Sequence, residues 1–227
     1  MHIEPGVVDG AKLLLSVGTA SVACALTGKA IVDTLRSDGV SALITRTLMT
    51  TFLVFLSFEV LWHHPVGVSE VHLIMGSTLF LLFGAAPTAL GLTLGLFIQG
   101  IFFAPTDLPQ FGMNLTSLLL PLFAIRLVAR QIVKPSTAYV DLSYRQTLKL
   151  SLVFQGGVVA WVAFWTLYGQ GLYAANWGAL ASFAAAYSPV IVIESLLDLG
   201  VLAIAKHMDS KNMRAPFAPR LTAASAT

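Results

Sequence analysis

Long apolar stretches separated by short polar segments make up most of the chain. Each stretch is predicted to be a membrane-spanning helix, because about 20 consecutive apolar residues cross the hydrocarbon core of a bilayer. The uncharged run 73–105 is too long for one span, so we expect a break at Ala85-Ala86-Pro87. The predicted spans, about seven in all, cover residues 10–28, 42–62, 71–84, 87–103, 112–133, 145–168 and 172–206.

The segments between and within these spans are predicted as well. Residues 29–41 are expected to form a polar loop. Pro189 is expected either to kink the last span or to separate a re-entrant piece, 172–188, from the final helix. The pattern therefore predicts an all-α polytopic membrane protein, with one transmembrane helical domain, 1–206, and a polar, disordered cytoplasmic tail, 207–227.

Composition agrees with this class of protein. Hydrophobic residues make up 56% of the 227-residue chain and charged residues 11%, compared with about 25% charged residues in a soluble domain, and the mean hydropathy is +0.81. A net charge of +2 argues against a nucleic-acid partner. The single Cys24 excludes an intrachain disulfide and a CxxC metal site.

The distribution of lysine and arginine predicts the orientation of the spans. All but one of the 13 basic residues fall on the same side of the predicted membrane, and the loops 63–70, 104–111 and 169–176 contain none. The basic side is expected to be cytoplasmic. The N-terminus is then outside, together with the first two of these loops, and the C-terminus is inside.

Met1-His2 is the most specific candidate for chemistry. The α-amine of Met1, the backbone nitrogen of His2 and the imidazole of His2 can close a five-membered and a six-membered ring on one metal ion. Such rings hold the donors near one plane, which suits Ni(II), Cu(II) and Co(II) better than Zn(II). The alternative is that histidine occupies the second position by chance.

A planar site needs a fourth donor, and His72 is the first choice. It is expected to open the third span, with Gly76 one turn further along the same face, although a histidine at a helix start is often only an interfacial residue. His63 and His64 are the alternative ligands, and adjacent histidines more often contact lipid headgroups. Ser69 and Glu70 look like a helix cap followed by a first-turn acid.

Three further polar residues are candidates for supporting roles. Asn114 could hydrogen-bond a ligand histidine or cap the fifth span. Glu194 lies deep in the last span, where an ionisable group is costly, and is expected to pair with another helix rather than bind metal. Asp198, one turn later, is expected to share its face.

Several enzyme classes lose support because their motifs are absent. The sequence contains no P-loop, no GxSxG and no HExxH, so ATP hydrolysis is not expected from this chain itself. The remaining enzyme hypothesis is an unusual membrane hydrolase that uses Ser69 and His72.

Four segments resemble the CbiM/NikM family, the substrate-binding membrane components of energy-coupling-factor transporters for cobalt and nickel. They are Met1-His2-Ile3-Glu4-Pro5-Gly6, the stretch 68–76 around His72, Gly112-Met113-Asn114 and Pro189 to Glu194. The resemblance implies that the Met1 amine, the His2 amide and imidazole, and His72 bind the metal. This chain departs from the family pattern in the order Glu4-Pro5, in Glu70-Val71 before the histidine, and in Ala104-Pro105-Thr106-Asp107.

The sequence therefore predicts the substrate-capture component of an importer for Co²⁺ or Ni²⁺, with no resident cofactor. By resemblance, its partners are a transmembrane coupling subunit and two ATP-binding subunits, with or without a small accessory membrane subunit, in the bacterial inner membrane. Small-residue faces on the first and fourth spans are candidate docking surfaces. The alternative is a membrane component for a non-metal substrate such as a vitamin.

Overall fold

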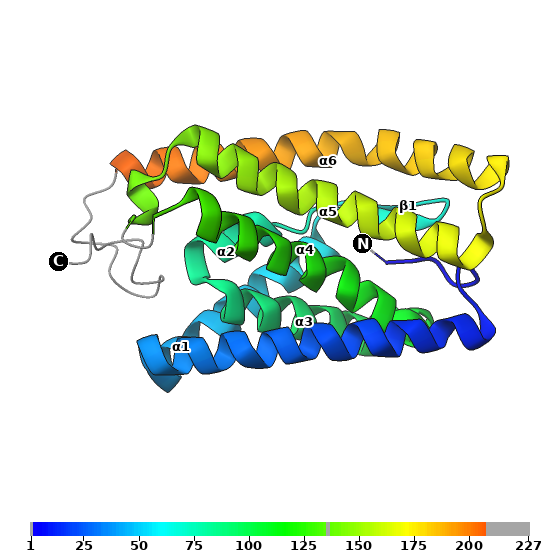
Figure 1. Cartoon of the computed structure of the whole chain (residues 1–227), viewed down its shortest axis with the longest axis horizontal. Coiled ribbons are helices and arrows are strands. Elements are labelled where there is room, and N and C mark those ends of the chain that lie inside the picture. The colour runs from blue at the N-terminus through cyan, green and yellow to red at the C-terminus, as the bar shows by residue number, and fades with distance from the viewer. Residues whose placement is uncertain (1, 135–136, 208–227) are drawn as a thin grey trace.

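Six α-helices and one β-hairpin form the framework of residues 2–134 and 137–207, which the computed structural model describes (Figure 1). The helices are α1 (Leu14–Phe55), α2 (Gly76–Phe83), α3 (Ala85–Phe102), α4 (Phe111–Ile132), α5 (Tyr144–Gln170) and α6 (Ala174–His207). The strands are β1 (His63–Val66) and β2 (Ser69–His72), and the short helical turns are η1 (Gly10–Leu13), η2 (Leu56–Val60), η3 (Pro105–Gln110) and η4 (Tyr139–Asp141). Met1 and the predicted tail beyond His207 lie outside the described residues.

The helices form a bundle around α2. Helix α1 packs against α3 and α4, and α5 packs against α4 and α6, so α1 and α6 run along opposite sides of the molecule (Figure 1). All residues of α2 except Leu82 are buried. The outer helices instead expose large apolar side chains, among them Leu14, Phe52, Leu196 and Ile204, as expected where a helix faces lipid.

Five helical segments of the described chain are long and apolar enough to cross a membrane. They are Gly10–Val60, Ala85–Phe102, Pro105–Ile132, Tyr144–Gln170 and Ala174–His207. The prediction of a mostly helical membrane protein is confirmed. The third predicted span, 71–84, is wrong as a membrane-spanning helix. Helix α2 in this region has 8 residues, whereas a span requires about 20.

The first two predicted spans lie in one segment, and the polar loop expected at 29–41 is wrong. Helix α1 continues through these residues and is interrupted only at Gly39, where φ is 84° and ψ is 175°. Glycine adopts this left-handed backbone without the steric cost that a Cβ would impose. The polar side chains of the region pair across and beyond this break: Arg46 bonds Asp38, and Arg126 of α4 bonds Asp33 at 2.7 Å.

The last predicted span is a single helix, α6, so of the two alternatives for Pro189 the separate re-entrant piece at 172–188 is wrong. Pro189 lies inside α6 and cannot donate a hydrogen bond to the carbonyl four residues earlier. The hydroxyl of Ser188 donates to that carbonyl, on Ala185, at 2.8 Å. This bond satisfies the acceptor that proline leaves open, and the helix continues past it.

Gly91 and Gly95 allow α3 to approach α1 closely. A Cβ on Gly91 would lie 2.3 Å from Oγ1 of Thr50, and one on Gly95 would lie 2.4 Å from Cγ1 of Val54. Thr50 also donates a hydrogen bond of 2.7 Å to the carbonyl of Pro87 on α3. This small-residue face of the fourth predicted span is used within the chain and is not free to dock a partner.

Replacing Gly91 with leucine should destabilise the protein, because the new side chain must displace the α1 backbone at Thr50. Overpacking of this kind costs about 1–3 kcal/mol, so the thermal unfolding midpoint of the detergent-purified protein should fall. Gly28→Leu is the matched control, since nothing lies within 4 Å of a Cβ there. Equal midpoints for the two variants would contradict the close contact.

Candidate metal centre

The N-terminal residues are held in place by the hairpin. Strands β1 and β2 pair antiparallel, with His63 opposite His72 and Val66 opposite Ser69. On the other edge of β2, Ile3 forms an antiparallel bridge with Ser69. The carbonyl of His2 accepts hydrogen bonds from the Glu70 amide at 3.0 Å and from the Ser69 hydroxyl at 2.8 Å. The backbone around His2 is therefore fixed relative to β2.

Asn114 fixes the same segment from the other side. Its Oδ1, near the start of α4, accepts a hydrogen bond of 2.7 Å from the backbone N–H of Ile3, and both residues are buried. The predicted supporting role of Asn114 thus acts on the backbone next to His2, and no bond to a histidine ring is present among the described residues.

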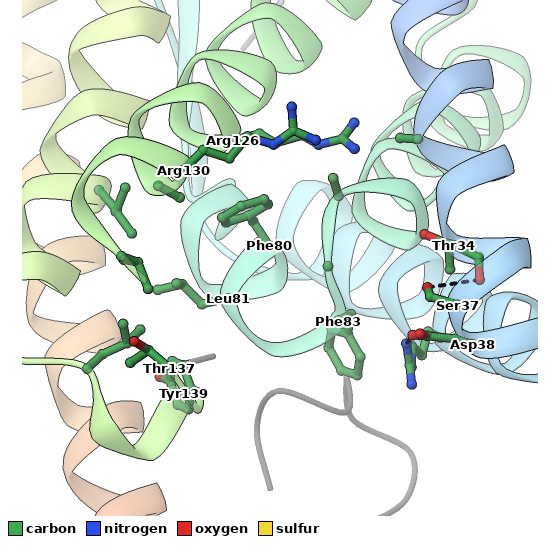
Figure 2. Close-up of a pocket in the computed structure, with 18 of the residues that line it drawn as sticks. Thr34, Ser37, Asp38, Phe80, Leu81, Phe83, Arg126, Arg130, Thr137 and Tyr139 are labelled. Atoms are coloured by element: carbon green, nitrogen blue, oxygen red, sulfur yellow. Dashed lines mark hydrogen bonds and ion pairs between the residues drawn. The ribbon is translucent and has the colours of Figure 1, made fainter. Parts of the chain in front are cut away.

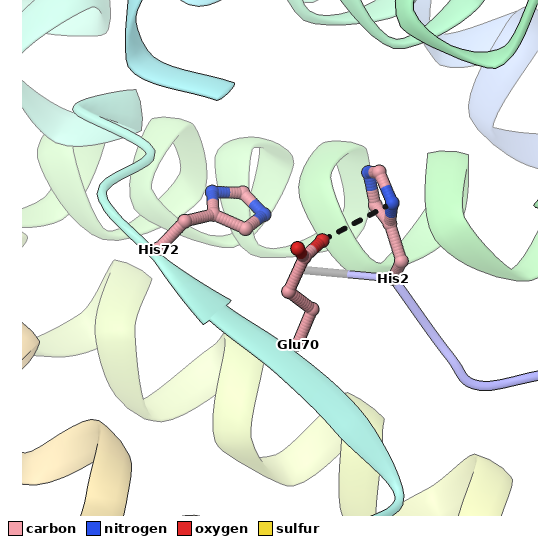
Figure 3. Close-up of side chains that lie close together, drawn as sticks. All are labelled: His2, Glu70 and His72. Atoms are coloured by element: carbon pink, nitrogen blue, oxygen red, sulfur yellow. Dashed lines mark ion pairs between the residues drawn. The ribbon is translucent and has the colours of Figure 1, made fainter. Parts of the chain in front are cut away.

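His2, Glu70 and His72 bring their side chains together at this place (Figure 3). Their nearest ligand atoms all lie within 4.8 Å of one another. His2 is 4% exposed and His72 is 1% exposed, and the Nε2 atom of each ring is buried without a hydrogen-bond partner in the described part of the chain. An unpaired buried polar atom is costly, so each of these nitrogens suits a bound group.

The tautomer of His72 favours metal binding. Its Nδ1 lies 2.9 Å from the carbonyl oxygen of Leu73. A carbonyl can only accept, so Nδ1 carries the proton and Nε2 keeps its lone pair. A backbone carbonyl that holds a histidine in this way is a common arrangement behind a metal ligand.

Carboxylates surround the His2 ring. Its Nδ1 lies 2.8 Å from Oδ2 of Asp107, in η3, and 3.4 Å from Oε2 of Glu70. Glu4 lies nearby: burial, and then the negative charges of Asp107 and Glu70, raise the pKa of its carboxyl. The region carries a negative potential that a divalent cation would relieve.

Burial also acts on the His2 ring itself. Desolvation is the largest influence, and it lowers the pKa of the imidazole below its ordinary value in spite of the neighbouring acids. A lowered pKa favours the neutral ring at pH 7, and the neutral ring is the form that can coordinate a metal.

The other predicted ligands lie apart from this cluster. His63 and His64 are exposed on β1, and His64 stacks on Trp62 with ring centroids 6.0 Å apart. Neither belongs to the group of converging donors found in the described residues.

The prediction that the third span begins around His72 is wrong. Ser69, Glu70 and His72 lie in β2, and α2 begins only at Gly76. Ser69 therefore caps no helix. Its hydroxyl donates to the carbonyl of His2, so the structure does not show the serine–histidine pair that the hydrolase hypothesis needs.

Glu194 and Asp198 of α6 hold the chain that follows His72. Glu194 accepts hydrogen bonds from the backbone amides of Ile74 and Met75, the latter at 3.0 Å, and from the side chain of Gln155. Asp198 accepts from the hydroxyls of Ser77 and Thr78 at 2.6 Å and 2.5 Å. The two acids share a face of α6 towards the start of α2.

Gly76 has a packing role at the same place. A Cβ there would lie 2.1 Å from the ring of Phe154 on α5. Glycine therefore lets α2 start directly against α5, below the loop that follows His72.

A cavity of about 600 Å³ lies at the far end of α2 and is an unsuitable metal site (Figure 2). The side chains that line it include Phe80 and Leu81 of α2 together with Arg126, Arg130 and Lys134. With Arg46, the lining has four cationic side chains and one carboxylate, that of Asp38. The excess of positive charge repels a divalent cation, so the converging donors beside β2 are the better candidate.

Sequence reasoning did not select Asp107 as a site residue. It is separated from His2 by 105 positions, and no local pattern connects the two. The available signal was that Asp107 is the one charged residue in the predicted outer loop 104–111.

Comparison with known proteins places the chain among metal transporters. The family model CbiM, described as a cobalt uptake substrate-specific transmembrane region, matches residues 2–211. No curated protein sequence matches. A crystal structure of a truncated transition metal transporter is similar with a TM-score of 0.67 and 16% identity, over 92% of this chain and 100% of that chain. A second transition metal transporter structure gives a TM-score of 0.66 and 17% identity, over 90% of this chain and 92% of that chain.

Replacing Asn114 with alanine should release the N-terminal segment, because the buried Ile3 amide loses its acceptor at a cost of about 1–3 kcal/mol. Hydrogen exchange of the N-terminal peptide, followed by mass spectrometry, should then be about tenfold or more faster at Ile3. Asn114→Asp keeps an oxygen acceptor and is the matched control. Unchanged exchange in Asn114→Ala would show that β2 alone holds the segment.

Proposed function

This chain belongs to the CbiM family of cobalt uptake transmembrane proteins, and from that premise we propose that it captures Co²⁺ or Ni²⁺ between His2 and His72. The observation that carries the proposal is the convergence of the buried His2 and His72 rings with the carboxylate of Glu70, whose ligand atoms lie within 4.8 Å of one another, together with the unpartnered Nε2 of His72. Nitrogen donors of this kind suit late first-row transition metals. The metal is the transported substrate in this proposal.

Met1 completes the proposed site, although it lies outside the described residues. Its α-amine, the His2 amide and Nδ1 of His2 form the chelate, and His72 supplies the fourth nitrogen through Nε2. The ion takes the place of the proton that Nδ1 shares with Asp107 in the metal-free protein. Each donor must lose a proton or be neutral, so binding should weaken as the pH falls.

The rest of the proposal concerns the assembly. We place the site on the outer face of the bacterial inner membrane, since the loops that form it, 63–70 and 104–111, contain no lysine or arginine. Import against a gradient needs energy, and the sequence has no nucleotide-binding motif. As the resemblance to the CbiM/NikM family implies, the proposed partners are a transmembrane coupling subunit and two ATP-binding subunits of the energy-coupling-factor type, with or without a small accessory subunit.

Substituting His2 or His72 with alanine should remove metal binding. We expect the affinity of the purified protein for Co²⁺ and Ni²⁺, measured by isothermal titration calorimetry, to fall by more than the roughly 10–100-fold that loss of a supporting group causes. His64→Ala is the matched control, because this imidazole is exposed and stacked on Trp62. Full binding by His2→Ala would refute the proposed site.

An extra residue placed before Met1 tests the chelate separately from the histidines. The amine would then sit one residue away and could no longer close the five-membered ring, so affinity should fall while the fold and the thermal midpoint remain unchanged. Unchanged affinity would remove Met1 from the ligand set and leave the histidine site standing.

A further inference from the structure

The cavity at the far end of α2 suits a ligand other than a metal ion. Its volume of about 600 Å³ lies within the range of about 300–1,000 Å³ that is usual for ligand pockets. Helix α2 ends at Phe83, and the backbone turns into α3 at Gly84, where φ is 91°. The short helix leaves space beyond its end, and residues of α1, α4 and α5 line that space together with α2 (Figure 2).

The lining of the cavity combines apolar walls with an excess of positive charge. The apolar side chains include Phe80, Leu81, Phe83, Val133, Leu142 and Leu150. The charged side chains are Asp38 and the four cations Arg46, Arg126, Arg130 and Lys134. A bare inorganic anion gains nothing from apolar walls, whereas an amphiphilic anion buries apolar groups against them and places its charge beside the cations. The lining therefore indicates an amphiphile with a negative headgroup.

Ion pairs within the chain neutralise two of the four cations. Arg46 bonds Asp38. Arg126 bonds Asp33 at 2.7 Å, and Asp33 itself does not line the cavity. Because these two arginines already have a carboxylate partner, they are not the charges that an added anion must neutralise.

Arg130 and Lys134 carry the remaining positive charge. Both are exposed residues of the cavity lining, and neither forms an ion pair with any residue that the structure describes. Arg130 follows Arg126 by one turn of α4, and like charges at that spacing repel each other. Phosphate oxygens accept charge-assisted hydrogen bonds from guanidinium and ammonium groups, and the hydroxyls of Thr34 and Thr137 in the same lining can also donate to them. The charge that is left over therefore indicates a phosphate group.

We propose that the cavity binds the phosphate headgroup of an anionic phospholipid, with Arg130 and Lys134 as its charge partners and the apolar walls against the lipid chains. Basic pockets between transmembrane helices on the cytoplasmic side bind such headgroups, and the distribution of lysine and arginine predicts that this end of the protein is cytoplasmic. The chain's own segment 208–227 is unsuited as the occupant, because it contains three basic residues and one acidic residue.

The test measures the binding of phosphatidylglycerol to the purified full-length protein in detergent by native mass spectrometry. In Arg130→Gln/Lys134→Gln the dissociation constant should rise about 30-fold, equivalent to about 2 kcal/mol at about 1 kcal/mol for each cation. Lys29→Gln/Arg36→Gln is the matched control and should bind like the wild-type protein, because it removes one exposed lysine and one exposed arginine that do not line the cavity. Arg130→Lys/Lys134→Arg keeps both charges and should keep most of the affinity.

Two further measurements separate the ligand from general effects. The thermal unfolding midpoint without lipid should be the same in all these variants, since none of them removes an ion pair of the described chain. Phosphatidylcholine, whose headgroup has no net charge, and inorganic phosphate, which has no apolar part, are tested in parallel. Both should bind more weakly than phosphatidylglycerol.

The outcomes decide the proposal without reference to the metal. Unchanged affinity in Arg130→Gln/Lys134→Gln, or an equal loss in the Lys29 and Arg36 control, would overturn the site. Equal binding of phosphatidylcholine would overturn the role of headgroup charge. Equal binding of inorganic phosphate that depends on Arg130 and Lys134 would overturn the assignment to a lipid. None of these results involves Co²⁺ or Ni²⁺, so the metal-capture proposal stands or fails separately.

Discussion

The pairing of the N-terminal segment with β2 is the constraint on which the site depends. Ile3 bridges Ser69, and its amide is held by Asn114. β2 and α4 supply these bonds and are distant from the N-terminus in the sequence. The backbone beside His2 is therefore fixed in position from two sides. Terminal segments are otherwise poorly ordered, because fixing them costs conformational entropy.

Order extends from the site into the bundle through hydrogen bonds between buried groups. The segment after His72 is bonded to Glu194, and the start of α2 is bonded to Asp198. Neither acid belongs to the group of converging donors, yet both hold the segment that follows His72. The far end of α2 lines the basic cavity, so this helix of two turns lies between the segment that follows His72 and the cavity.

The helices could be predicted from the sequence more accurately than the loops. Helices α3, α4 and α5 begin and end within about two residues of the predicted spans, because the length of an apolar run sets the length of a membrane helix. The hairpin was not predicted, since His63-His64-Pro65-Val66 shows no alternation of apolar and polar residues. The polar loop expected at 29–41 was also wrong. Polar residues can remain helical when their side chains pair with one another, and a single sequence does not show that pairing.

The candidate site was predictable in part. His2, Glu70 and His72 were all singled out from the sequence, and the structure brings them together. Asp107 could not be selected in this way, because its approach to His2 depends on how η3 follows α3. Residues that meet through tertiary packing leave no periodic signal in a single sequence.

The bond between Ile3 and Asn114 also has a consequence for biogenesis. The two residues are 111 positions apart, so two long apolar segments, Gly10–Val60 and Ala85–Phe102, are synthesised before Asn114 exists. During synthesis the segment around Ile3 can pair with β2 first, and the Ile3 amide gains the Asn114 acceptor only once the start of α4 has been made. The segment around His2 is therefore fully held only after the start of α4 has been made, long after residues 2 and 3 themselves have been translated.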